Sequence, residues 1–161
     1  MRYTTMTDAA PVVPLEEFLS MAGRDLGFGA WRRIDQAAID AFAELTGDRQ
    51  FIHVDPEKAA KTPFGGTIAH AFFVLSLLGG AGLERTPRPE GGAVGLNYGF
   101  DRVRFTQPVR SGGRVRPHFA VKAVERKAPG RILVTLAVSV EIEGQDKPAL
   151  VADWLVMVLG A

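Results

Sequence analysis

Residues 68–83 read IAHAFFVLSLLGGAGL and form the longest apolar stretch of the 161-residue chain. The stretch contains one histidine, one serine and three glycines, and it is shorter than the roughly 20 apolar residues that a membrane-spanning helix needs. A helix that is apolar nearly all round is buried inside a protein. We therefore predict a buried helix over about 67–78 that ends at Gly79-Gly80, followed by a flexible connection over 81–92, and no membrane span.

Four strand-like segments follow this helix, at 94–105, 113–127, 131–143 and 149–160. The third is the clearest, because an apolar residue stands at every second position from Ile132 to Ile142. Turn residues at 128–130 and 144–147 link neighbouring segments, and links this short favour antiparallel pairing. The pattern predicts a four-strand antiparallel meander, to which a short strand at 28–34 could add a fifth member.

The first half of the chain is typical of helices. Residues 14–22 predict a short helix, and a second helix is expected over about 36–46. Asp35 is a favourable N-cap for the second helix, and Gly47 suits its C-terminal end because glycine accepts left-handed backbone angles. The following link, 48–67, is long and irregular, with one short helical piece after Pro56, and loops of this length are uncommon unless they are functional.

Helices followed by a run of strands predict an α+β fold rather than alternating α/β units. A helix that is apolar all round can be covered only if the sheet curves around it, and one sheet covers only one side. The other side needs the N-terminal elements or a second subunit, so we expect a homodimer. The length predicts a single domain over 1–161, with 1–27 as an N-terminal helical extension.

Composition excludes several classes of function. The net charge is +1, which offers no electrostatic reason to expect nucleic acid or an anionic membrane as partner. There is no cysteine, which excludes disulfides, thiol catalysis and cysteine metal sites. The N-terminus has no apolar core of a secretory signal, so a cytoplasmic location is expected. Histidine chemistry is limited to His53, His70 and His118.

The stretch GDRQFIH at 47–53 is where ionisable residues, a helix end and an irregular loop come together. Asp48 lies just beyond the predicted helix and His53 follows five residues later, after apolar Phe51 and Ile52. An imidazole titrates near neutral pH, so a carboxylate and an imidazole can position one water and move its protons. An alternative is that Asp48 only caps backbone amides in the loop.

The pair Gly65-Gly66 leads into the predicted buried helix. Two glycines allow a ligand to approach the backbone, and the unpaired N–H groups of a helix N-terminus suit an oxyanion such as an enolate. The alternative is that the glycines only make a turn. His70 lies within the apolar run, where it is either functional or a hydrogen-bonded packing histidine. Asp55 precedes Pro56 and is most simply an N-cap, and His118 lies among basic strand residues and is expected to be solvated.

Four motifs occur in order along the chain: Phe42-Ala43-x-x-Thr46-Gly47-Asp48, His53-x-Asp55-x-x-x-Ala59, Phe64-Gly65-Gly66-Thr67-Ile68-Ala69-His70, and the run Asn97–Phe105 with Pro108-Val109. Taken together, these motifs resemble one family, the MaoC-like or (R)-specific enoyl-CoA hydratases, and in particular the branch that contains nodulation protein N. The resemblance covers about residues 28–158.

The resemblance implies a hot-dog fold, in which a curved antiparallel sheet wraps a long helix, and a homodimer. It implies reversible syn addition of water to a trans-2-enoyl thioester, with Asp48 and His53 as the catalytic dyad. A backbone N–H near Gly66 or Ala71, beside His70, would hold the thioester oxygen. No metal or redox cofactor is implied, because coenzyme A, or an acyl carrier protein in its place, is part of the substrate.

The chain departs from the family pattern in two places. Residues 49–51 are Arg, Gln and Phe, where the family often has Asn-Pro or a similar sequence, and this leaves the spacing of Asp48 and His53 intact. The family usually has glycine after the second histidine, whereas this chain has Ala71, whose methyl group could crowd the thioester. Two other functions stay open at this point: an acyl-CoA thioesterase, because one fold supports several chemistries, and a non-catalytic dimer that binds acyl thioesters.

Overall fold

The computed structural model describes residues 10–91 and 93–160. Its elements, in chain order, are β1 (Val12–Val13), α1 (Leu15–Leu19), β2 (Asp25–Phe28), β3 (Arg32–Arg33), α2 (Gln36–Thr46), α3 (Phe51–Val54), α4 (Pro56–Ala59), α5 (Ala71–Arg85), β4 (Arg88–Pro89), β5 (Val94–Phe105), β6 (Arg114–Ala128), β7 (Arg131–Ile142) and β8 (Leu150–Leu159).

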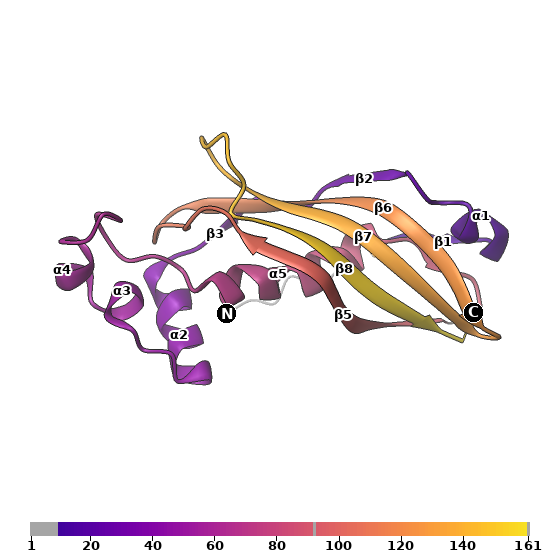
Figure 1. Cartoon of the computed structure of the whole chain (residues 1–161), viewed down its shortest axis with the longest axis horizontal. Coiled ribbons are helices and arrows are strands. Elements are labelled where there is room, and N and C mark those ends of the chain that lie inside the picture. Colours follow the sequence, from indigo (N-terminus) through magenta and orange to yellow (C-terminus); the bar gives the residue numbers. More distant parts are fainter. Residues whose placement is uncertain (1–9, 92, 161) are drawn as a thin grey trace.

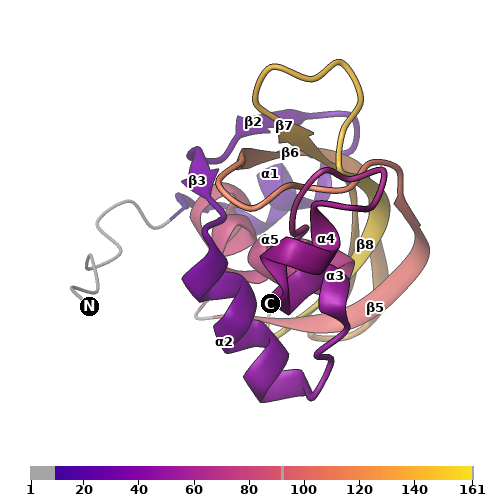
Figure 2. The same cartoon turned by 90° about the vertical axis from the view of Figure 1, so that its left-hand side faces the viewer.

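A curved antiparallel sheet wraps around the long helix α5, as Figure 1 shows. The strands lie in the order β2-β6-β7-β8-β5, and β3 pairs with β6 beside β2. The helices α2, α3 and α4 gather at the end of the molecule where α5 begins, and α1 lies at the opposite end (Figures 1 and 2). This arrangement confirms the predicted α+β hot-dog fold.

The predicted alternation along β7 decides which face of the sheet meets the helix. All six alternating apolar residues are buried, namely Ile132, Val134, Leu136, Val138, Val140 and Ile142. They share one core with Val74 and Leu78 of α5. Because side chains on a strand alternate between its two faces, this period of two fixes the inner face of the sheet.

The position of β5 differs from the predicted meander. Only β6, β7 and β8 are consecutive neighbours, and β5 pairs with β8 at the far edge. The link from β5 to β6 therefore crosses the end of the sheet, where Val109 accepts a backbone hydrogen bond from Ala69 and Gly112 donates one to Ile34. Short links correctly predicted antiparallel pairing for β6–β8, but the longer link over 106–113 permits this crossing.

The central helix was also predicted with the wrong ends. It begins at Ala71 rather than 67, and it continues through Gly79-Gly80 to Arg85. One of its glycines serves close packing: a Cβ on Gly82 would lie 2.6 Å from Cζ3 of Trp154. No helix in the described parts of the chain is long and apolar enough to cross a membrane.

The segment 81–92, predicted as a flexible connection, is largely ordered into elements. Its first residues complete α5, and β4 pairs in parallel with β1 near the N-terminus. Tertiary pairing with a distant segment has overridden the loop-like proline and glycine composition. Gly92 lies outside the described residues.

The N-terminal part contains more strand than predicted. Residues 1–9 of the predicted extension 1–27 lie outside the described residues, and α1 confirms the helix expected within 14–22. The strand expected at 28–34 is two short strands, β2 and β3, that both pair with β6. Since β2 begins at Asp25, the extension is tied into the sheet before its predicted end.

Candidate active site

Helix α2 has the ends that the sequence predicts, and its end delivers Asp48. The Asp35 carboxylate accepts the Ala38 N–H at 2.9 Å, and Gly47 stops the helix in the left-handed conformation with φ 77°. The following link contains an unpredicted turn, α3, which carries His53 and ends directly before α4. The link therefore contains two short helices rather than one.

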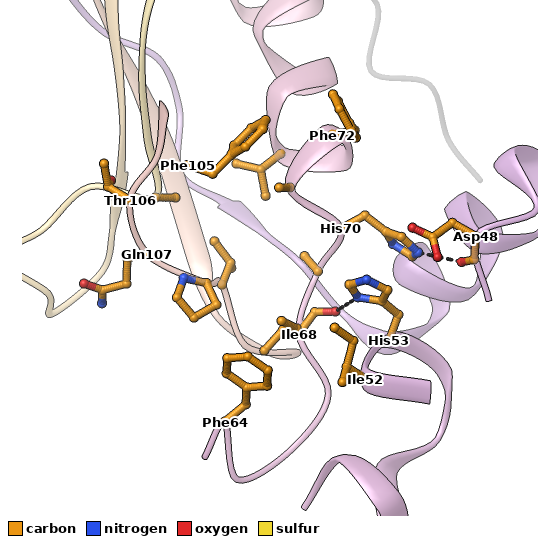
Figure 3. A pocket seen from close by; sticks show the side chains of 16 residues that line it. Asp48, Ile52, His53, Phe64, Ile68, His70, Phe72, Phe105, Thr106 and Gln107 are labelled. Carbon is orange, nitrogen blue, oxygen red and sulfur yellow. Dashed lines mark hydrogen bonds between the residues drawn. The ribbon is translucent and has the colours of Figure 1, made fainter. Parts of the chain in front are cut away.

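A cavity of about 430 Å³ opens where α3 meets the beginning of α5. Asp48, His53, His70 and Ala71 line it, together with the strand end and crossing link at 105–109 (Figure 3). Most of the other lining residues are apolar, including Ile52, Phe64 and Phe72. An apolar lining strengthens the interactions of the few polar groups inside it.

His53 is buried, and one hydrogen bond fixes its ring. Its Nδ1 lies 2.7 Å from the carbonyl oxygen of Ile68. A carbonyl only accepts, so Nδ1 carries the proton and donates it. In the neutral ring Nε2 is then left as an acceptor, which is the form a general base requires.

Asp48 is exposed, and its backbone carbonyl and its carboxylate accept hydrogen bonds from different residues. Its backbone carbonyl accepts a hydrogen bond from His70 Nε2 at 2.8 Å. Its carboxylate accepts the Gln50 N–H only at 3.3 Å, a long contact that resembles the loop-capping alternative. A carboxylate that accepts one weak bond keeps the capacity to accept another from a bound water.

His70 occupies the N-cap of α5 and stacks on His53 with ring centroids 3.8 Å apart. Because Asp48 accepts from Nε2, the buried Nδ1 is an acceptor in the neutral ring, and among the described residues it has no partner. Its hydrogen bond and stacking agree with the packing alternative, and its place in the lining keeps it next to any bound ligand.

Asp48, His53 and His70 offer three atoms within 4.8 Å of one another, a spacing that a metal ion could use. The two rings are inclined by only 25°, however, so the in-plane lone pairs of their nitrogens do not converge on one point between them. Tetrahedral or octahedral coordination needs such convergence. The arrangement therefore favours hydrogen bonding of water over metal binding.

Of the two positions expected for a backbone donor, Gly66 and Ala71, only Ala71 lies at the start of α5. Because α5 begins at Ala71, its first unpaired N–H groups are there, next to the cavity. Gly66 precedes this helix by five residues and is absent from the cavity lining. The pair Gly65-Gly66 therefore belongs to the turn that precedes residues 67–70, as the turn alternative has it.

Asp55 and His118 have structural environments outside the cavity. The Asp55 carboxylate caps α4 by accepting the Lys58 N–H at 3.0 Å, which confirms the N-cap interpretation. This backbone hydrogen bond, aided by the Lys58 side chain, holds the pKa of Asp55 below its ordinary value. His118 is less solvated than predicted, because it lies 2.9 Å from Asp25 and against Phe28.

Gln36 is the residue that sequence reasoning missed. Its side chain joins the backbone of His53 to the hydroxyl of Thr67, which are 17 and 31 residues away. Helical periodicity places Gln36 only as the first residue of α2, and no local signal indicates such distant partners.

Comparisons with known proteins show the family of the chain. The profile of the MaoC like domain matches residues 17–143. The chain is 45% identical to nodulation protein N of Rhizobium leguminosarum bv. viciae, over 89% of this chain and 90% of that protein. It is 41% identical to 3-hydroxyacyl-thioester dehydratase Z of Mycobacterium tuberculosis, over 87% of this chain and 92% of that protein.

Among solved structures, the (R)-hydratase from A. caviae involved in PHA biosynthesis is similar in fold, with a TM-score of 0.69 and 27% identity. The similarity covers 84% of this chain and 94% of the (R)-hydratase. The fold, the matched domain profile and the identity to full-length relatives lead to one conclusion. This chain belongs to the MaoC-like dehydratase family.

Proposed function

We propose that the protein is an (R)-specific enoyl-thioester hydratase/dehydratase that adds water reversibly, in syn fashion, to trans-2-enoyl thioesters. One observation carries the proposal: the acceptor Nε2 of His53 and the carboxylate of Asp48 share an apolar cavity with the N-terminus of α5. Relatives named as an (R)-specific enoyl-CoA hydratase and a 3-hydroxyacyl-thioester dehydratase support the same reaction class.

In the proposed hydration, Asp48 and His53 hold one water between them. The water oxygen bonds to the β-carbon, the carbon–carbon π electrons move toward the thioester carbonyl, and the dyad takes one water proton. The dyad then returns a proton to the α-carbon, which yields the 3-hydroxyacyl thioester. Both new bonds form on the face that meets the dyad, so addition is syn. The atoms balance as substrate plus water, and no redox cofactor takes part.

The enolate that forms during this step carries negative charge on the thioester oxygen. The N–H of Ala71 is the donor we assign to it, because a first-turn amide has no partner within the helix and the positive end of the helix dipole adds to the attraction. A small methyl group at Ala71 leaves this amide accessible from the cavity that it lines.

We also propose that the protein acts as a homodimer on thioesters of coenzyme A or of an acyl carrier protein. β5 is one of the edge strands of the sheet and one of its longest strands, and it exposes large apolar side chains. Leu96 and Tyr98 are 48% and 64% exposed, and Phe72 of α5 is 68% exposed. A second copy placed against β5 would cover this surface and provide pairing for its free edge.

The test is a steady-state assay with trans-2-enoyl-CoA substrates of several chain lengths. Hydration is monitored as the loss of the absorption of the conjugated thioester. Chiral analysis of the product should show the (R)-3-hydroxyacyl form. Asp48→Asn and His53→Gln are expected to lower kcat by roughly 10²–10⁴-fold, the usual contribution of a general acid or base. His118→Gln is the matched control, because it removes a histidine outside the cavity.

Three outcomes separate the alternatives. Release of free thiol from acyl-CoA without hydration would identify a thioesterase. Thermal stabilisation by enoyl-CoA without turnover would identify a non-catalytic binding protein. Hydration at the wild-type rate by both dyad variants would reject the assignment of Asp48 and His53.

A further inference from the structure

Gln36 makes three side-chain hydrogen bonds at the start of α2. Its Nε2 group donates to the carbonyl oxygen of His53 at 2.7 Å and to the carboxylate of Asp40 at 2.8 Å. Its Oε1 accepts the hydroxyl of Thr67 at 2.5 Å. The two N–H groups face two acceptors and the carbonyl faces a donor, so only one orientation of the amide satisfies all three partners.

Two of the three partners of Gln36, His53 and Thr67, belong to the two segments that surround the dyad. His53 lies on α3, and Thr67, which is buried, lies in the link that enters α5. These segments are also joined by the Ile68 N–H, which donates to Ile52 at 3.0 Å, and by His53 Nδ1, which donates to Ile68. Gln36 therefore closes a small network around the bond that fixes the His53 ring.

We propose that Gln36 is a positioning residue for the reaction: it holds α3 against the link before α5 and so sets the direction of His53 Nε2. This role rests on the proposed function, and Gln36 itself is not among the residues that line the cavity. It acts through the backbone of His53 and the hydroxyl of Thr67. The bonds at 2.5 and 2.7 Å leave little freedom for the two segments to shift.

The test replaces one atom of the network at a time. Gln36→Glu keeps an acceptor for Thr67 but puts an oxygen against the His53 carbonyl, and Thr67→Val removes only the hydroxyl. Both are expected to lower kcat by up to about 100-fold with little change in KM, as small misplacements of catalytic groups do. Thr67→Ser restores the hydroxyl and should restore kcat.

Asp40→Ala is the control, because it removes the third partner of Gln36 without touching the bonds to His53 and Thr67. It should keep the wild-type kcat. The double variant Gln36→Glu/Thr67→Val should be no slower than the slower single variant, since both changes open the same network. Thermal unfolding of every variant shows which of them remain folded at the assay temperature.

A second measurement decides the role without using activity. The Nδ1 proton of His53 is buried and hydrogen-bonded, and with three histidines in the chain its NMR signal can be assigned by comparison with His53→Gln. Gln36→Glu is expected to shift or broaden this signal, whereas Asp40→Ala should leave it unchanged. An inactive wild type would reject the proposed function, while the response of this signal would still test positioning.

The proposal is overturned if folded Gln36→Glu keeps the wild-type kcat, or if kcat falls while the His53 signal is unchanged. If the wild type has no hydratase activity, an unchanged His53 signal in Gln36→Glu is by itself sufficient to overturn the positioning proposal.

Discussion

The imidazole rings of His53 and His70 stack with their centroids 3.8 Å apart, and each ring donates one hydrogen bond to a different backbone carbonyl. His53 donates from Nδ1 to Ile68, and His70 donates from Nε2 to Asp48. Each bond fixes a tautomer, and the stacking prevents either ring from turning alone. The two residues of the proposed dyad are thereby connected through His70, which touches both.

This connection predicts the effect of His70→Phe. Phenylalanine can keep the stacked ring but loses the donor to the Asp48 carbonyl, so the loop that carries Asp48 loses an anchor. We expect kcat to fall by up to about 100-fold, because the carboxylate is displaced relative to His53. Steady-state kinetics with an enoyl thioester measures it, and a wild-type kcat would show that His70 has only a packing role.

Removing one backbone donor tests the site of the thioester oxygen. Ala71→Pro deletes the N–H, while proline is favoured at the first position of a helix and the preceding His70 already has extended angles, φ −58° and ψ 134°. Helix α5 should therefore form normally. We expect kcat to fall by roughly 10²–10³-fold, as when one oxyanion donor is lost.

Ala71→Val is the control for crowding, because it adds comparable bulk and retains the N–H. If Ala71→Val is as slow as Ala71→Pro, bulk rather than the missing donor explains the loss, and another group must hold the oxygen. Ala71→Gly should remain active, since it keeps the donor and enlarges the cavity.

Alanine substitutions at two glycines of α5 are predicted to have opposite effects on the free energy of unfolding. A Cβ on Gly82 would lie 2.6 Å from the Trp154 ring, whereas a Cβ on Gly80 would meet no atom of the described residues within 4 Å outside its own helix backbone. Gly82→Ala should destabilise the fold by about 1–3 kcal/mol through overpacking. Gly80→Ala should stabilise it by about 0.4–1 kcal/mol, because it reduces the entropy of the unfolded chain. Urea unfolding measures both, and equal effects would contradict the packing assigned to Gly82.

The proposed subunit interface is tested by a charge on the outer strand. Tyr98→Lys places an ammonium group on β5, where a second copy would bury it without a partner, and should convert dimers to monomers. Leu45→Lys is the control, since Leu45 is 86% exposed on α2. Light scattering with size-exclusion chromatography measures the mass. A monomeric wild type, or a Tyr98→Lys variant that stays dimeric, rejects β5 as the interface.

Much of the local structure could be predicted because its signals lie within a few residues. Asp35 and Gly47 mark the ends of α2, since an N-cap carboxylate and a left-handed glycine act on the adjacent turn. The period of two along β7 identifies the buried face of the sheet. The spacing from Asp48 to His53 indicated the segment that lines the cavity. The proposed chemistry came from the resemblance to a known family.

Other features were decided by contacts between residues far apart in the chain. β5 pairs with β8 because a crossing link lets it reach the other edge, and nothing within β5 specifies that neighbour. α5 continues through its glycines because Gly82 faces Trp154, 72 positions later, where local propensity predicts an end. The bonds from Gln36 to His53 and Thr67 likewise exist only after three segments meet. Local sequence determined the helices, the strands and the chemical groups that they carry, because caps and periodicity act within one turn or one strand. Packing decided which elements became neighbours, because it depends on contacts between surfaces of segments that are far apart in the chain.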